Sequence, residues 1–108
     1  MNKDKIIEVI RNEFKGQAMN EWKSDCAYLS PDGKKCAIGI FIPDGHMAFT
    51  QEYGVEELLA FYPDLKKHMP SSDVKLLGKF QEVHDNLNAH SSVEEQRDML
   101  IKFVMENF

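Results

Sequence analysis

Apolar residues recur with helical spacing in four stretches of the chain. In the first stretch, Ile6, Ile10 and Phe14 follow one another at intervals of four residues, which predicts an amphipathic helix over residues 3–15. Asn2 stands just before this stretch, where a side-chain oxygen can accept a hydrogen bond from a backbone N–H of the first turn. The pattern therefore predicts a capped amphipathic helix near the start of the chain.

Three more helices are predicted in the second half of the chain, over residues 52–62, over residues 72–88, and from Ser92 to near the last residue. Pro63 should end the first of them, because the residue before a proline is pushed out of the α-helical region. Ser92 and Glu95 have the spacing of a capping box at the start of the last helix. The side chains expected on the core face of that helix are Met99, Leu100, Phe103 and Val104.

Residues 25–42 depart from the helical spacing and predict a β-hairpin. The sequence Ser-Pro-Asp-Gly at residues 30–33 suits a type I turn that is closed by Gly33 with a positive φ. In the register that this turn sets, Tyr28 lies opposite Cys36. Side chains two residues apart then point to the same face of the hairpin.

The second predicted strand, residues 36–42, is apolar at almost every position, so both of its faces should be covered. A second Pro-Asp-Gly at residues 43–45 would fold residues 46–50 back as a third strand. No linker or low-complexity segment interrupts the chain. The predicted fold class is therefore α+β: a single domain over residues 1–108, in which a small antiparallel β-hairpin or three-stranded meander packs against about four α-helices.

The composition fits one small domain with a core of its own. The chain has 108 residues, of which 43% are hydrophobic. Its apolar runs are far shorter than the ~18 residues of a membrane span, and charged residues interrupt the N-terminal stretch, unlike in a signal peptide. The net charge of −5 disfavours a general nucleic-acid binder, which concentrates basic residues. We therefore expect a soluble cytoplasmic protein with no membrane partner and no nucleic-acid partner.

The two cysteines, Cys26 and Cys36, are the first candidates for chemistry. Across the predicted hairpin they are diagonal neighbours about 7–8 Å apart, which exceeds disulfide geometry, although a one-residue shift of the turn would place them opposite each other. Buried free thiols are favoured, and a disulfide stays open. Zinc held by these cysteines with His46 and His84 is disfavoured, because structural zinc ligands usually come in closely spaced pairs. We therefore expect no metal and no cofactor.

Cys36, His84 and Asp85 provide an alternative, a small thiol- or metal-dependent enzyme. A cysteine nucleophile needs an accessible, electropositive position, whereas Cys36 begins an apolar strand. On the predicted helix His84 points toward the core, while Asp85 turns about 100° away. The favoured interpretation is a buried structural histidine bonded to a backbone carbonyl or to the Tyr28 hydroxyl. Catalysis is therefore the less favoured hypothesis.

The hairpin also carries a motif that continues on the long helix. It reads C-x-Y, a glycine turn, then C-A-I-G-x-x-I-x-D, with Q-x-x-H-D downstream. The positions are Cys26, Tyr28, Gly33, Cys36, Ala37, Ile38, Gly39, Ile42, Asp44, Gln81, His84 and Asp85. The motif resembles that of a family of small proteins encoded by tailed bacteriophages and prophages, which has no established activity. The resemblance implies a phage origin and a scaffold rather than a reaction, and it implies that the hairpin packs on the His84 helix, with Gly39 small because that helix passes close.

The leading hypothesis is therefore a phage- or prophage-type accessory protein that binds another protein, in host takeover or counter-defence, and catalyses nothing. Its basis is the resemblance, the small size, the acidic balance and the lack of a convincing active site. The candidate contact residues are Pro43, Asp44, His46, Phe49 and Tyr53. The thiol- or metal-dependent enzyme is the alternative. A third possibility, a nucleic-acid mimic, would need most carboxylates gathered on one face.

Overall fold

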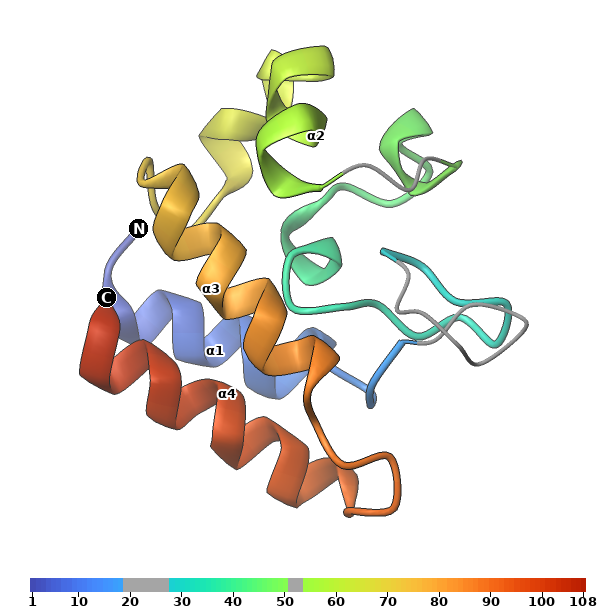
Figure 1. Ribbon diagram of the computed structural model, residues 1–108, viewed down its shortest axis with the longest axis vertical. Helices are drawn as coiled ribbons and strands as arrows, with labels where there is room; N and C mark the ends of the chain where they lie inside the picture. The colour runs from blue at the N-terminus through green and yellow to red at the C-terminus, as the bar shows by residue number, and fades with distance from the viewer. Residues whose placement is uncertain (19–27, 51–53) are drawn as a thin grey trace.

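The computed structural model describes residues 1–18, 28–50 and 54–108 (Figure 1). Its elements in chain order are α1 (Lys3–Glu13), the 3₁₀ helices η1 (Gly39–Phe41) and η2 (Met47–Thr50), α2 (Val55–Phe61), the 3₁₀ helix η3 (Pro63–His68), α3 (Val74–Asp85) and α4 (Val93–Asn107). Within these ranges no β-strand forms, and one isolated antiparallel bridge joins Leu29 to Lys35. None of the helices in these ranges has the length and apolar character needed to cross a membrane.

The helices α1, α3 and α4 form the body of the protein (Figure 1). α4 packs against both α1 and α3, and α2 packs against the other end of α3. The 3₁₀ helix η1 contacts α1, which attaches the middle of the chain to this body. The two ends of the chain lie together, since Lys3 Nζ donates a hydrogen bond to the Met105 carbonyl oxygen 3.0 Å away.

Side-chain caps fix where the longer helices begin. Asn2 Oδ1 accepts from the Lys5 N–H at 2.8 Å and Ser92 Oγ accepts from the Glu95 N–H at 3.1 Å, which confirms both predicted caps. Helix α3 begins later than predicted, because Asp73 is its cap and accepts from two backbone N–H groups of the first turn. The predicted helices are therefore present, with shifted ends.

One core joins these elements. Its fully buried side chains include Phe14 at the end of α1, Leu58 of α2, Phe80 of α3 and Leu100 of α4. The Phe80 ring also stacks on Phe103 with centroids 5.8 Å apart. Burying a large apolar side chain of this kind stabilises a fold by about 1.5–3 kcal/mol. The segments between the α-helices contribute to the same core, since Ile38 and Ile42 are also buried.

The core face of α4 differs from the prediction. Leu100 and Val104 are fully buried as predicted, but Met99 is 55% exposed. Gln96 and Ile101, which were not predicted, are buried in its place. The helix is therefore turned so that a polar side chain faces inward and a methionine faces outward.

The α+β prediction, with its β-hairpin, is wrong. The turn itself is present: the Ser30 N–H donates to the Lys34 carbonyl oxygen at 2.8 Å, and the Cys36 N–H donates to the Tyr28 carbonyl oxygen at 3.3 Å. The ladder then stops, because the Ile40 N–H donates back to the Cys36 carbonyl oxygen and the chain coils into η1. A short, wholly apolar run is compatible with a buried strand or a buried helical turn, and here it forms the turn.

The three-stranded meander is wrong as well. After the second Pro-Asp-Gly, the His46 N–H donates to the Pro43 carbonyl oxygen at 3.2 Å, and η2 follows instead of a strand. His46 Nδ1 accepts from the Ala48 N–H at 2.9 Å, a local bond that favours the tight coil over an extended chain. Residues 46–50 therefore coil locally and form no strand with another segment of the described chain.

Candidate functional site

The motif residues of the middle segment, which we define as residues 28–50, and those of α3 come together in space. Gln81 Oε1 accepts from the Ile38 backbone N–H at 3.3 Å, so the α3 side chain meets the segment that follows Cys36. Gln81 Nε2 donates in turn to Asp85 Oδ1 at 3.1 Å. The residues of Q-x-x-H-D therefore join α3 to the segment that carries Cys36.

His84 lies at the centre of this cluster and is fully buried. Its Nε2 accepts from the Ala18 backbone N–H at 3.0 Å, and its Nδ1 lies 3.0 Å from Asp85 Oδ1. Because Nε2 accepts, the neutral ring carries its proton on Nδ1 and donates it to the Asp85 carboxylate. The Phe14 ring meets the imidazole edge-on, with centroids 6.1 Å apart.

His84 is thus a buried structural histidine with different partners from those expected. A backbone N–H and an adjacent carboxylate take the places of the backbone carbonyl and the Tyr28 hydroxyl. Both ring nitrogens are occupied, so neither is available to a substrate or to a metal in this arrangement.

Cys36 is a fully buried free thiol. Its Sγ accepts from the Gly39 N–H at 3.1 Å, and burial raises the pKa of the thiol to about 12. A catalytic cysteine needs the opposite, a lowered pKa and access to solvent. The geometry therefore gives the thiol-enzyme alternative no support.

Gly39 is small for a different reason from the one expected. A Cβ at this position would lie 2.3 Å from the Tyr28 carbonyl oxygen, which is a backbone atom that cannot move aside independently. The close neighbour is therefore the segment before the turn, and not α3. The missing side chain lets the η1 coil fold back against residue 28.

Two predicted residues, Cys26 and Tyr53, lie outside the described residues. Within the described ranges no three His, Cys, Asp or Glu side chains are placed to hold a metal ion. Comparisons with protein-family models, with curated proteins and with solved structures found no match for the chain. The resemblance to the phage and prophage family therefore stays a prediction.

The predicted contact residues lie around η2, at the other end of the middle segment. His46 Nε2 lies 2.8 Å from Asp64 Oδ2, and the His46 ring meets the Tyr62 ring edge-on with centroids 5.3 Å apart. Since Nδ1 accepts from the Ala48 N–H, the proton of the neutral ring is on Nε2 and is donated to Asp64. His46 therefore ties η2 to the junction of α2 and η3.

Lys35 holds the same region from the other side. Its ammonium group pairs with the exposed Asp44 carboxylate and lies 5.3 Å from the centroid of the Phe49 ring, within the range of a cation–π contact. Pro43 beside Asp44 is exposed. Four of the five predicted contact residues are therefore brought together by interactions that fix the loop.

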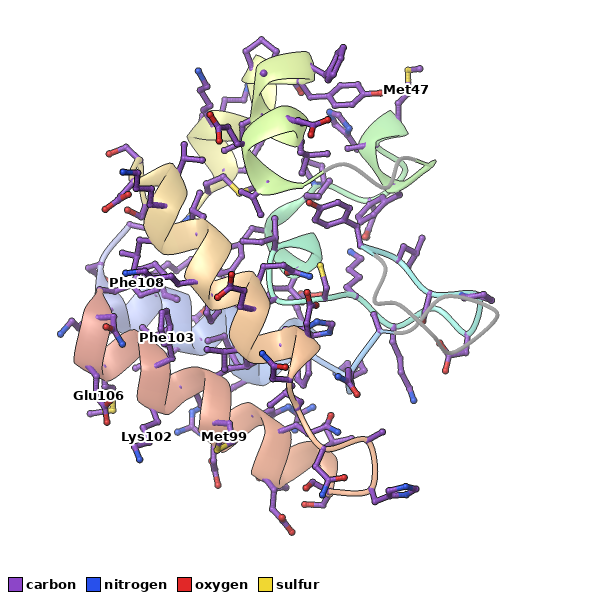
Figure 2. The ribbon with its side chains drawn as sticks, in the orientation of Figure 1. Met47, Met99, Lys102, Phe103, Glu106 and Phe108 are labelled. Carbon is purple, nitrogen blue, oxygen red and sulfur yellow. The ribbon has the colours of Figure 1, made fainter. Side chains whose placement is uncertain are left out.

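Two large apolar side chains on this part of the protein are open to solvent. Met47 is 70% exposed and Phe61 is 63% exposed. They directly follow and precede the touching pair His46 and Tyr62 in the chain, and Met47 extends from the edge of the molecule in Figure 2. We call His46, Met47, Phe49, Phe61 and Tyr62 the η2 surface.

Three residues of this region, Lys35, Met47 and Asp64, had no sequence signal that singled them out. Lys35 follows the turn at residues 30–33, and Asp64 follows Pro63 as turn residues commonly do. The sequence pattern places Met47 in a predicted strand. Its exposure depends on the η2 coil, which the local sequence pattern does not predict.

Proposed function

We propose that the protein acts by binding another protein through the η2 surface and catalyses no reaction of its own. The observation that carries the proposal is the pair Met47 and Phe61, exposed by 70% and 63% at positions adjacent to the His46–Tyr62 contact. Large apolar side chains that gather on an ordered surface are typical of protein interfaces, where a few such residues supply most of the affinity.

The scaffold beneath these side chains supports the proposal. His46 is bound on both ring nitrogens, and Lys35 is paired with Asp44 and stacked on Phe49. A surface that is already ordered before binding loses less conformational entropy on association. Met47 adds a flexible, polarizable side chain, which adapts to the shape of a partner.

The biological role that we propose is that of a phage- or prophage-type accessory protein in the bacterial cytoplasm, taking part in host takeover or counter-defence. The resemblance of residues 26–44 and of Gln81, His84 and Asp85 to that family is its support. A small protein whose reactive groups are used for packing fits a role that depends on contact rather than on turnover.

The test is affinity capture from bacterial lysate, followed by titration of the purified partner. The Met47→Asp and Phe61→Asp variants should each weaken binding about thirtyfold, as expected for loss of ~2 kcal/mol at an interface hot spot. Met105→Asp is the matched control, because Met105 is 61% exposed on α4, away from this surface. A lysate without a saturable partner, or equal affinity in all variants, would contradict the proposal.

A further inference from the structure

A second surface lies at the end of the protein opposite η2, where the loop between α3 and α4 meets the first turns of α4 (Figure 1). It is a groove of about 480 Å³. The residues that line it are Asn86, Leu87, Asn88, Ser91, Glu95, Gln96, Asp98, Met99 and Lys102. A volume of this size accommodates a few amino-acid side chains.

The inner part of the groove is apolar and fixed. Leu87 is buried, and Met99 is 55% exposed and projects from α4 in Figure 2. Gln96 is held in place, since its Nε2 donates to the Asn88 carbonyl oxygen at 2.9 Å and its Oε1 accepts from the Gln17 N–H at 2.9 Å. The amide of Gln96 is therefore already bonded, and the groove offers an apolar side chain a place against Leu87 and Met99.

The rim of the groove is acidic. Glu95 and Asp98 line it, and within the described part of the chain neither carboxylate has an ion-pair partner; Lys102 is the one basic lining residue. The surrounding sequence has the same sign. Over residues 86–102 the acidic residues are Glu94, Glu95 and Asp98, and the basic residues are Arg97 and Lys102. Two acidic side chains and one basic side chain line the groove, so its rim carries a net negative charge.

We propose that this groove binds a lysine- or arginine-bearing segment of a partner protein, with one apolar side chain of that segment seated against Leu87 and Met99. The acidic rim selects basic groups and repels phosphates, and the apolar interior selects for a protein segment over a simple cation. The inference goes beyond the η2 surface, because it gives the protein two separate contact surfaces at opposite ends. With the groove and the η2 surface at opposite ends, the protein would bridge two partners.

The test is a titration of the ¹⁵N-labelled protein with a short synthetic peptide that alternates lysine and leucine. Chemical-shift changes should concentrate on residues 86–102, and raising NaCl from about 50 mM to about 500 mM should weaken binding several-fold, because salt screens rim charges. A peptide with glutamate in place of lysine should bind at least tenfold more weakly. Shifts spread over the whole surface, or equal binding of the acidic peptide, would overturn the proposal.

Two sets of variants separate the groove from general charge. Glu95→Gln with Asp98→Asn should weaken the lysine–leucine peptide about tenfold, and Met99→Ser should weaken it several-fold. The control pair Glu8→Gln with Glu56→Gln removes the same charge from exposed sites outside the groove and should have little effect. An equal loss in the control pair would refute the groove. Met47→Asp should leave peptide binding unchanged, so the groove and the η2 surface succeed or fail independently.

Discussion

The backbone N–H of Ala18 donates a hydrogen bond to His84 Nε2 at 3.0 Å, although 66 residues separate the two in the chain. Gln17 adds to this connection, because its Nε2 donates to the His84 carbonyl oxygen at 3.0 Å and its N–H donates to Gln96 Oε1 at 2.9 Å. The chain leaving α1 is therefore fastened to the end of α3 and to the start of α4. A polar network fixes this corner of a core that is otherwise apolar.

His84→Ala should destabilise the protein by about 3 kcal/mol, because it opens a cavity and leaves the buried Ala18 N–H without an acceptor. His84→Gln keeps an acceptor in the side chain and should lose less. The free energy of unfolding from urea titration measures both. Asp85→Asn is the control for the exposed end of the network and should cost less than about 1 kcal/mol. A loss below that value for His84→Ala would contradict the structural role.

Substitution by alanine should have opposite effects on stability at two glycines, Gly39 and Gly78. Gly39→Ala places a Cβ 2.3 Å from the Tyr28 carbonyl oxygen, so the segment must shift, and we expect a loss of about 2 kcal/mol or more. Gly78→Ala in α3 meets no atom within 4 Å and should stabilise the helix by up to about 1 kcal/mol. Thermal unfolding of both variants checks this. Similar melting temperatures for the two would show that the packing around Gly39 is not as described.

The helices could be predicted from the sequence because each has a periodic apolar face, and two of them also begin at a recognisable capping residue. Asn2 and Ser92 mark helix starts that the structure confirms. The segment over residues 36–42 could not be predicted in this way, since an apolar side chain at nearly every position gives no period to distinguish a strand from a coil. What decides its conformation is the contact of Gly39 with residue 28, which is a tertiary feature.

The candidate sites were predictable to different degrees. The inward position of His84 follows from the helical period, and the structure buries it fully. The partner that it takes, Ala18, comes from a distant part of the chain and has no sequence signal. On α4, the hydrophobicity pattern places Met99 in the core, but Gln96 is buried instead because it satisfies backbone groups at residues 17 and 88. A hydrophobicity pattern does not predict the burial of a polar side chain whose role is to form hydrogen bonds with backbone groups.

Asp64 should titrate below the ordinary value for an aspartate. The hydrogen bond from His46 lowers the pKa of its carboxyl group from 3.8. A carboxylate whose pKa is lower in the folded state favours folding above the unfolded value, and that contribution is lost as the pH falls through the folded value. Carboxyl ¹³C shifts should show this titration, and His46→Ala should return Asp64 toward 3.8. Asp44, whose pKa is lowered by Lys35, should keep its position in that variant.

The Cys36 thiol should react slowly with iodoacetamide at neutral pH. Burial raises its pKa to about 12, so the reactive thiolate is scarce, and the fully buried sulfur is also inaccessible. The experiment uses a Cys26→Ser background, in which Cys36 is the only thiol, and compares the folded protein with the protein in urea. Alkylation should be at least a hundredfold faster in urea. Rapid alkylation of the folded protein would restore the thiol-enzyme alternative.

The same burial predicts a loss of stability in alkaline solution. In the unfolded chain the Cys36 thiol loses its proton near pH 9.0, whereas in the folded protein it keeps that proton up to about pH 12. The unfolded state therefore binds fewer protons across this interval, and stability falls as the pH rises, by at most about 1.4 kcal/mol per pH unit. Burial also raises the pKa of Tyr28 above 10.0, so a second contribution begins there. Urea unfolding from about pH 8 to about pH 10 should show the decline. The decline should be shallower in Cys36→Ala, since only the thiol contribution is removed, and an identical slope would mean that Cys36 ionises equally in both states.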